Sequence, residues 1–340
     1  MDSPLPGPVR VAASTRLGLF TIAELTAAQV TEREIRSAVR SGAWVRLRRG
    51  SFVTAADLAA VEAAGRRHEL DAFAVTAAIA RPTAALSHGT AARLWRLPVP
   101  PGLPPDVRLT DPERWRSGPG YVMTRADLPS AEVTTCGRHR LTTPARTLVD
   151  TAREWPELPA VAALDAALLR ELVTPELLQH TLHRHRFHPR APRAARAVAA
   201  ADGRAETWLE TKGRLRFRAA CLPPFVPQVG LWVGGRLIKV VDGWYQDAAL
   251  AVEFDGRVKY VDPAYGGRPE DVLFDEKRRE DALRAVGVRF LRVVDEDLER
   301  GWVPLADRVR RELTVAGPVD RSFRAVPRAL GRRRVVGQSG

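Results

Sequence analysis

Two acidic residues in the C-terminal third of the chain lie inside apolar stretches, which is an unusual place for a charge. Asp242 lies in the run from Leu237 to Trp244, and Glu253 lies in the run from Ala249 to Phe254. Burying an unpaired carboxylate costs several kcal/mol unless a partner or a cation offsets that cost. The two acids therefore predict a divalent-metal site carried by adjacent strands.

The chemistry that such a pair favours is hydrolysis of a phosphodiester bond. That reaction needs a water held in line and a cation that neutralises the charge developing on the phosphate. Mg²⁺, or Mn²⁺ in its place, prefers hard oxygen ligands, and Mg²⁺ takes only one or two carboxylates from the protein. We therefore expect Asp242 and Glu253 to bind the metal from one face of a sheet.

The residues around both acids predict the elements that position them. The Gly-Gly pair at 234–235 is typical of a two-residue hairpin turn, and the strand that carries Glu253 is apolar on both sides, as interior strands are. A strand, helix, strand connection further on predicts a right-handed crossover. In order, the expected elements are a helix at 205–221, strands at 227–233, 236–245 and 250–256, a helix at 273–287, a strand at 288–295 and a last helix.

Five blocks of this region also carry a family resemblance: AETWLET, CLPPFVPQ, VVDGWY, LAVEFDG and FDEKRREDALRAVGVRFLRVVDEDL. In order and spacing they resemble the domain of uncharacterised actinobacterial proteins related to the very-short-patch-repair endonucleases. That group has the PD-(D/E)xK, restriction-endonuclease-like fold. The resemblance implies a nuclease-like α-β-β-β-α-β-α domain at 201–314 and metal-dependent cleavage of DNA.

The same resemblance implies roles for individual residues. Asp242 and Glu253 match the two acids of the family pattern, and Glu210 on the first helix matches an additional acid. The pattern expects Lys two residues after the glutamate, where this chain has Asp255. Lys277 on the next helix, or Lys259, is expected to replace it. Asp255 is then a third metal ligand, or a turn former beside Gly256.

The N-terminal segment predicts a second module, at residues 15–58. Thr21 with Glu24 and Thr31 with Glu34 are capping boxes that begin two short helices. The second helix presents arginines three and four residues apart, and a basic hairpin follows, so the module is expected to be a winged helix-turn-helix that binds DNA. The alternative is a helix pair with solvated arginines. The expected DNA-binding residues are Arg33, Arg36, Arg40, Arg46, Arg48 and Arg49.

The blocks RRGSFV, LSHGTAARLWRLP and TTPARTLVDTAR are similar to an AbiEi-type antitoxin region found ahead of that nuclease-like domain. Residues 59–200 are therefore expected to be a mostly helical antitoxin-like α+β region that ends in a basic linker. Residues 315–340 predict a basic disordered tail. The fold class expected for the whole chain is α/β, or α+β overall.

Histidines in the middle region offer further chemistry. Ser87 and His88 are adjacent, and we expect Ser87 to cap a helix and His88 to be a satisfied polar residue, in preference to a catalytic pair. A second cluster lacks the spacing of one helical face, so a zinc site and a phosphate-facing basic loop both stay open. Its members are His180, His183, His185 and His188.

Composition sets the wider limits. The chain has 340 residues and a formal net charge of +13, carried by Arg more than Lys, which favours a nucleic-acid partner over solvated arginines alone. Cys136 and Cys221 lack CxxC spacing and are expected in the core. A leader-like N-terminus and an apolar run of about 18 residues are both missing, so no membrane contact and a cytoplasmic location are expected.

Three functions remain open at this stage. The first is a metal-dependent DNA endonuclease that uses Asp242 and Glu253. The second is a non-catalytic, antitoxin-like transcriptional regulator with an inactive nuclease fold. The third is an antitoxin that binds a cognate toxin without touching DNA. A homodimer is compatible with each of them.

Overall fold

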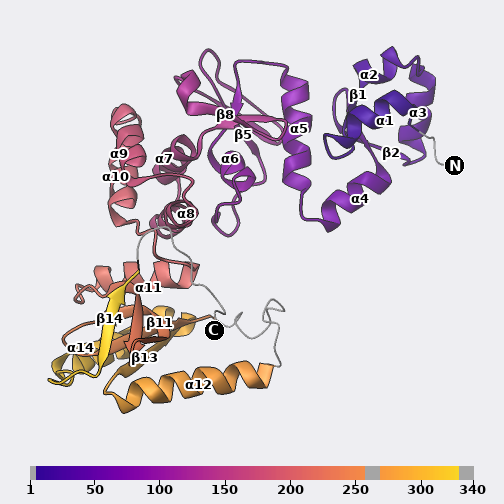
Figure 1. The fold of residues 1–340 in the computed structure, drawn as a ribbon. Coiled ribbons are helices and arrows are strands. Elements are labelled where there is room, and N and C mark those ends of the chain that lie inside the picture. The colour runs from indigo at the N-terminus through magenta and orange to yellow at the C-terminus, as the bar shows by residue number, and fades with distance from the viewer. Residues whose placement is uncertain (1–4, 257–268, 329–340) are drawn as a thin grey trace. The chain divides into compact units, whose positions relative to one another are not determined.

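A computed structural model describes residues 5–256 and 269–328 of the chain. The protein is of mixed α and β structure and divides into two compact units, residues 1–154 and 155–340 (Figure 1). The predicted boundary near Ala200 is therefore displaced. The cause is that the helices just before it belong with the C-terminal sheet, as described below.

The N-terminal unit begins with a small helical module on a sheet of strand order β1-β3-β2. Both predicted capping boxes are present. The side chains of Thr21 and Thr31 accept from the backbone N–H groups of Glu24 and Glu34, and the threonine backbone N–H groups donate to the glutamate carboxylates. The predicted basic hairpin is also confirmed as an antiparallel pair. The elements are α1 (Gly7–Ser14), β1 (Phe20–Thr21), α2 (Ile22–Ala27), α3 (Glu32–Arg40), β2 (Trp44–Arg48) and β3 (Ser51–Thr54).

Apolar side chains explain why this module holds together. Leu25 of α2 and Ile35 of α3 pack with Trp44, Phe20 and Phe52 of the three strands in one buried cluster. Gly42, after α3, has a φ of +78°, a left-handed conformation that favours glycine and turns the chain into β2.

The rest of the N-terminal unit surrounds a sheet of order β6-β7-β5-β4-β9-β8. Its six strands make this region richer in β structure than the mostly helical prediction, because several strands are short and polar and alternate only weakly. The elements are α4 (Ala55–Ala63), α5 (Arg67–Ile79), β4 (Ala85–Leu86), α6 (His88–Leu94), β5 (Val107–Asp111), β6 (Arg116–Gly118), β7 (Tyr121–Arg125), η1 (Ser130–Glu132), β8 (Val133–Cys136), β9 (His139–Thr142) and α7 (Pro144–Glu154).

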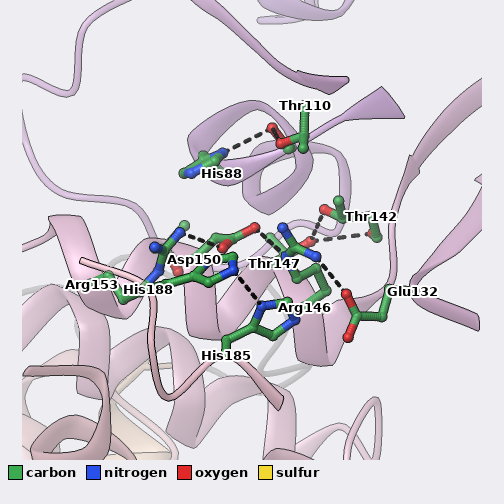
Figure 2. Close-up of polar contacts among 12 residues, drawn as sticks. His88, Thr110, Glu132, Thr142, Arg146, Thr147, Asp150, Arg153, His185 and His188 are labelled. Carbon is green, nitrogen blue, oxygen red and sulfur yellow. Dashed lines mark hydrogen bonds and ion pairs between the residues drawn. The ribbon is translucent and has the colours of Figure 1, made fainter. Parts of the chain in front are cut away.

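A buried ion network fixes α7 in this unit. Figure 2 shows Arg146 directed at Glu132 and Asp150, and the Arg146 side chain is only 1% exposed. Arg146 Nε donates to Asp150 Oδ2 over 2.7 Å, and Arg153 Nη2 donates to Asp150 Oδ1 over 2.7 Å. Buried charges of this kind are tolerated only when they are paired.

The C-terminal unit opens with helices where a basic linker was predicted. The arginine-rich stretch instead forms α9 and α10, and the small residues Ala191, Ala194 and Ala197 of α10 are buried. Asp165 of α8 accepts from Thr211 and Arg214 of α11 over 2.7 Å each. The linker prediction is wrong because several alanines of α10 are buried while Arg184 and Arg196 are exposed, as in helices with one packed face. They are α8 (Glu157–Leu169), α9 (Pro175–Arg184), α10 (Ala191–Ala200) and α11 (Trp208–Ala219).

A five-stranded sheet of order β13-β12-β11-β10-β14 follows. The predicted hairpin and the parallel pairing of β12 with β13 are confirmed. The elements are β10 (Val226–Val233), β11 (Arg236–Tyr245), β12 (Leu250–Asp255), α12 (Pro269–Ala285), β13 (Arg289–Val294), α13 (Asp295–Glu299), α14 (Trp302–Thr314) and β14 (Phe323–Pro327).

Two predictions outside the site need correction. Residues 323–327 were assigned to a disordered tail, but they form β14 at the sheet edge, drawn yellow in Figure 1, because Phe323 is buried beside Trp244. Residues 329–340 lie outside the described part.

Cys221 is exposed and Cys136 half-buried, so neither is a fully buried core residue. No helix within residues 5–256 and 269–328 has the length and apolar character that crossing a membrane requires.

Candidate functional site

Asp242 and Glu253 lie on neighbouring antiparallel strands in the C-terminal unit. Gly243 pairs with Val252 at the end of this ladder, and each acid lies one residue beyond that pair on its own strand. The amide of Phe254 donates to Asp242 Oδ2 over 2.9 Å. Both acids are 3% exposed. Both predicted carboxylates are therefore buried on neighbouring strands of the sheet.

Glu210 joins them from the first turn of α11. Its backbone N–H donates to Thr207 Oγ1, and its carboxylate accepts from Thr207 Oγ1 over 2.8 Å and from the amide of Glu206 over 3.0 Å. These contacts fix the carboxylate at the helix N-terminus, where a negative charge is favoured. The side chain is thereby positioned without freedom to turn to solvent.

Gln228 of β10 connects Glu210 to Asp242. Its Nε2 group donates to Glu210 Oε2 over 2.9 Å and lies 3.4 Å from Asp242 Oδ1. Burial, and then the charge of Asp242, raises the pKa of Glu210 to about 7. Two carboxylates that share one amide and repel each other are chemically suited to a bound cation.

Lys239 is the site residue that the sequence interpretation missed. Its Nζ atom lies 3.5 Å from Glu253 Oε1 and 3.2 Å from Glu276 Oε1 on α12, and its side chain is 10% exposed. The signal was present in the sequence, because Lys239 is the one cation inside the apolar run that leads to Asp242. It was overlooked since the family pattern directed attention to positions after Glu253.

The other two predicted site residues have different surroundings. Asp255 ends β12, and its Oδ2 lies 3.8 Å from Arg292 Nη1. Lys277 is exposed on α12. The described contacts do not bring either residue to Glu210 or Asp242, and Lys259 lies outside the described residues. Their predicted roles in catalysis have no support from this geometry.

The donor set decides which metal suits the site. Within residues 5–256 and 269–328, no three or more His, Cys, Asp or Glu side chains are grouped closely enough to hold a metal ion. Zinc and other metals that need three or four protein ligands therefore do not fit. Glu210 and Asp242, as a carboxylate pair, fit Mg²⁺ or Mn²⁺, because Mg²⁺ keeps several waters and needs only one or two carboxylates.

The predicted DNA-binding arginines lie in the N-terminal unit. Arg33, Arg36 and Arg40 are exposed on α3, and Ile35 and Ala38 of the same helix are buried. Arg36 pairs with Glu32 over 3.0 Å at the surface. The helix therefore presents a basic face to solvent.

The hairpin arginines differ from one another. Arg46 lies over the ring of Phe52, and Arg49 is exposed. Arg48 is turned inward, because its Nη2 donates to Pro119 O over 2.7 Å and its guanidinium lies over the ring of Tyr121. In this structure Arg48 connects the hairpin to β7, which differs from the predicted contact with DNA.

Local contacts account for His88, and His185 and His188 lie beside each other. Ser87 is at the N-cap position of α6 but makes no side-chain capping bond, contrary to prediction; its Oγ lies 2.8 Å from His88 Nδ1 and accepts from Thr110. His88 is a satisfied buried residue, as predicted, with 2% exposure. Ser87 is also fully buried. His185 Nδ1 lies 3.4 Å from His188 Nε2.

Comparison with known proteins adds two relatives. They are uncharacterized proteins of Mycobacterium tuberculosis, one from strain CDC 1551 and one from strain H37Rv, each 29% identical over 175 residues. The match spans 51% of this chain and 61% of each relative. No protein-family model matches the chain.

Proposed function

We propose that this protein is a DNA-binding protein with a Mg²⁺- or Mn²⁺-dependent endonuclease domain. One observation carries the proposal: Glu210 and Asp242 are buried and joined by the amide of Gln228. Glu253 is buried on the strand next to that of Asp242, and the amine of Lys239 lies 3.5 Å from it. Burying these groups is costly, and acids with perturbed pKa values gather at functional sites. This set favours the PD-(D/E)xK relationship that the sequence resemblance implies.

In this proposal some residues bind the cation and others position the attacking water. Glu210 and Asp242 would hold the cation, which supplies charge neutralisation at the phosphate when bound. Gln228 keeps the two carboxylates in a fixed relation. Glu253 and Lys239 form the adjacent pair that would orient the attacking water and hold its proton. Lys239 thus replaces the lysine that the family pattern expects at position 255.

The N-terminal module would supply affinity for duplex DNA. Its order of helices and strands, together with the basic face of α3, supports a winged helix-turn-helix in which α3 enters the major groove. Arg33 and Arg40 would contact phosphates or base edges there. A relation to AbiEi-type antitoxins is part of this proposal, and so are a cognate toxin and a homodimer as partners.

The test is cleavage of supercoiled plasmid by the full-length protein in Mg²⁺ and in Mn²⁺. We expect the wild type to nick or linearise the plasmid, and Asp242→Asn, Glu253→Gln and Glu210→Gln to lose at least about 100-fold in rate. Asp307→Asn is the matched control, because Asp307 is 53% exposed in the same unit and pairs with Arg310 at the surface.

Two results would overturn the proposal. Cleavage that survives all three site substitutions would come from a contaminant or another site. No cleavage by the wild type on any DNA form, with Mn²⁺ binding also absent by calorimetry, would remove the enzyme function.

A second function is supported by position 255. Asp255 is engaged by Arg292 where a catalytic lysine is expected, and this favours a regulator whose nuclease fold has lost activity. In that case the wild type would bind a specific duplex through α3 and bind no Mn²⁺. Gel-shift selection from random duplex DNA, run beside the cleavage assay, separates the two functions.

A further inference from the structure

An aromatic patch lies on the same sheet as the carboxylates, near the β10–β11 turn. Trp232 is half-buried on β10 and pairs across the strands with Leu237 of β11 and Arg324 of β14. Leu237 is 42% exposed and Val326 is 41% exposed. We call Trp232, Leu237 and Val326 the tryptophan patch.

Glycines leave space around this patch. A side chain on Gly230 would lie 3.1 Å from both Trp232 Nε1 and Leu237 Cδ1, so these two side chains lie over the glycine. The turn residues Gly234 and Gly235 have nothing within 4 Å of an added Cβ. Together with β14 they bound an open groove of about 570 Å³. Trp232, Arg321, Phe323, Arg324 and Val326 are among the residues that line it.

The groove is positively charged. Arg324 is exposed, and Arg321 is held over the ring of Phe323 at 5.7 Å while its Nε donates to Pro318 O. None of the residues that line the groove is acidic. A half-buried indole that lines a groove together with arginines fits a nucleotide, because bases stack on aromatic rings and guanidinium groups contact phosphates.

Strand β14 leads from the groove to the carboxylate site. Arg324, Val326 and Arg328 point to the same face, since side chains alternate along an extended chain. Arg328 Nη1 lies 3.4 Å from Gln228 Oε1, and its backbone N–H donates to Gln228 O over 2.9 Å. Gln228 is four residues before Trp232 on β10, a separation of about 13 Å along a strand. One short run of single-stranded nucleic acid spans that distance.

We propose that the tryptophan patch is a binding site for an unpaired nucleobase, with the flanking phosphates on Arg321 and Arg324. The site takes single-stranded DNA, either an overhang or a base outside the helix, and directs that strand toward Gln228 and the carboxylates. This inference rests on the proposed function and narrows its substrate to DNA that contains an unpaired segment.

A second copy of the chain is the competing occupant, because β14 is an edge strand. Two features disfavour it: Pro327 has no N–H to donate, and Arg321, Arg324 and Arg328 of two copies would face one another. Charge complementarity therefore favours a nucleic acid.

Binding of a fluorescent eight-nucleotide oligo-dT to the full-length protein in EDTA tests the proposal. EDTA prevents cleavage, so binding is read by anisotropy independently of activity. We expect Trp232→Ala to weaken binding about 5- to 150-fold, and Trp232→Phe to restore most of it because a ring remains. Arg324→Ala should lower the salt dependence of binding by the slope of one phosphate contact.

Trp115→Ala is the control, because Trp115 is 67% exposed in the other unit. Thermal unfolding of each variant verifies that it is folded. Equal binding by Trp232→Ala and Trp115→Ala would overturn the proposal, and so would failure of the wild type to bind oligo-dT. Neither result would affect plasmid cleavage, so the cleavage assay tests the proposed function independently of this binding assay. A dimer in light scattering that Trp232→Ala dissociates, with oligo-dT binding unchanged, would assign the patch to self-association.

Discussion

Lys239 and Lys277 differ in burial, and this difference decides which lysine serves the carboxylates. Lys239 is held between Glu253 and Glu276, whereas Lys277 is exposed on α12. We expect Lys239→Met to reduce plasmid cleavage at least about 100-fold, because the amine that stabilises charge at the site is lost. Lys277→Met should cleave at the wild-type rate. Mn²⁺ binding by calorimetry should persist in both variants, since Glu210 and Asp242 are unchanged.

An equal loss in the two lysine variants would contradict this assignment and return Lys277 to the site. Lys239→Arg distinguishes a catalytic role of the amine from a role in the stability of the fold, because it keeps the positive charge. If it restores thermal stability but not cleavage, the amine has a chemical role beyond neutralising Glu253 in the fold.

Asp150 makes a second prediction at the residue scale. Asp150→Asn leaves the buried guanidinium of Arg146 without full pairing, so unfolding should cost about 3–5 kcal/mol less than in the wild type. Asp71→Asn is the control, because Asp71 pairs with Arg67 at the same i,i+4 spacing on an exposed helix face. That change should cost less than about 1 kcal/mol. Chemical denaturation measures both, and equal losses would contradict the burial argument.

The same carboxyl group gives a pH dependence. Burial would raise the pKa of Asp150, but His88, Arg146 and Arg153 outweigh burial and lower the pKa to about 2. Burial also lowers the pKa of His88, which favours its neutral form. Arg146 and Arg153 therefore supply the permanent positive charge beside Asp150. A folded pKa below the unfolded value of about 3.9 stabilises the protein above that pH, and the stabilisation is lost as pH falls toward 2. The midpoint temperature of thermal unfolding should therefore fall more between pH 4 and pH 2 in the wild type than in Asp150→Asn.

At the scale of elements, the close approach of α11 to β12 depends on a glycine. A Cβ on Gly213 would lie 2.1 Å from Cε1 of Phe254, which is closer than any real contact. Gly213→Ala should therefore push the helix from the sheet and cost about 1–3 kcal/mol. Gly7→Ala has open space and is the control. Because Glu210 lies on the same helix, cleavage should fall in Gly213→Ala at temperatures where the protein remains folded. Unchanged stability would show that the helix adapts without cost.

Elements with strong local signals could be predicted from the sequence, and elements without them could not. The capping boxes at Thr21 and Thr31 and the Gly234-Gly235 turn specify local structure by hydrogen bonding and backbone conformation, so those predictions are confirmed. Strand β14 was missed because its stability comes from pairing with β10, a partner far away in the sequence.

The candidate site followed the same rule. Asp242 and Glu253 were identified because acids are rare within apolar runs. Gln228 and Lys239 were not, since an uncharged amide and a strand lysine acquire meaning only when the sheet register places them beside Glu210 and Glu253. The arginines near α10 were misread for a related reason. Charge alone does not distinguish a linker from a helix with one solvated face.

For the whole molecule, a net charge of +13 predicts general attraction to DNA, and the question is whether α3 adds more than that attraction. Replacing Arg33, Arg36 and Arg40 together by Ala should weaken duplex binding and reduce the slope of log K against log salt by about 3. The matched control replaces Arg308, Arg310 and Arg311, three exposed arginines on α14, and changes the net charge equally. Fluorescence anisotropy over a range of salt concentrations measures both. If α3 reads duplex DNA, the first variant loses affinity and slope while the second changes little, and oligo-dT binding by the C-terminal unit persists in both. Equal losses would mean that duplex binding arises from total charge alone, and α3 would then be a solvated basic helix.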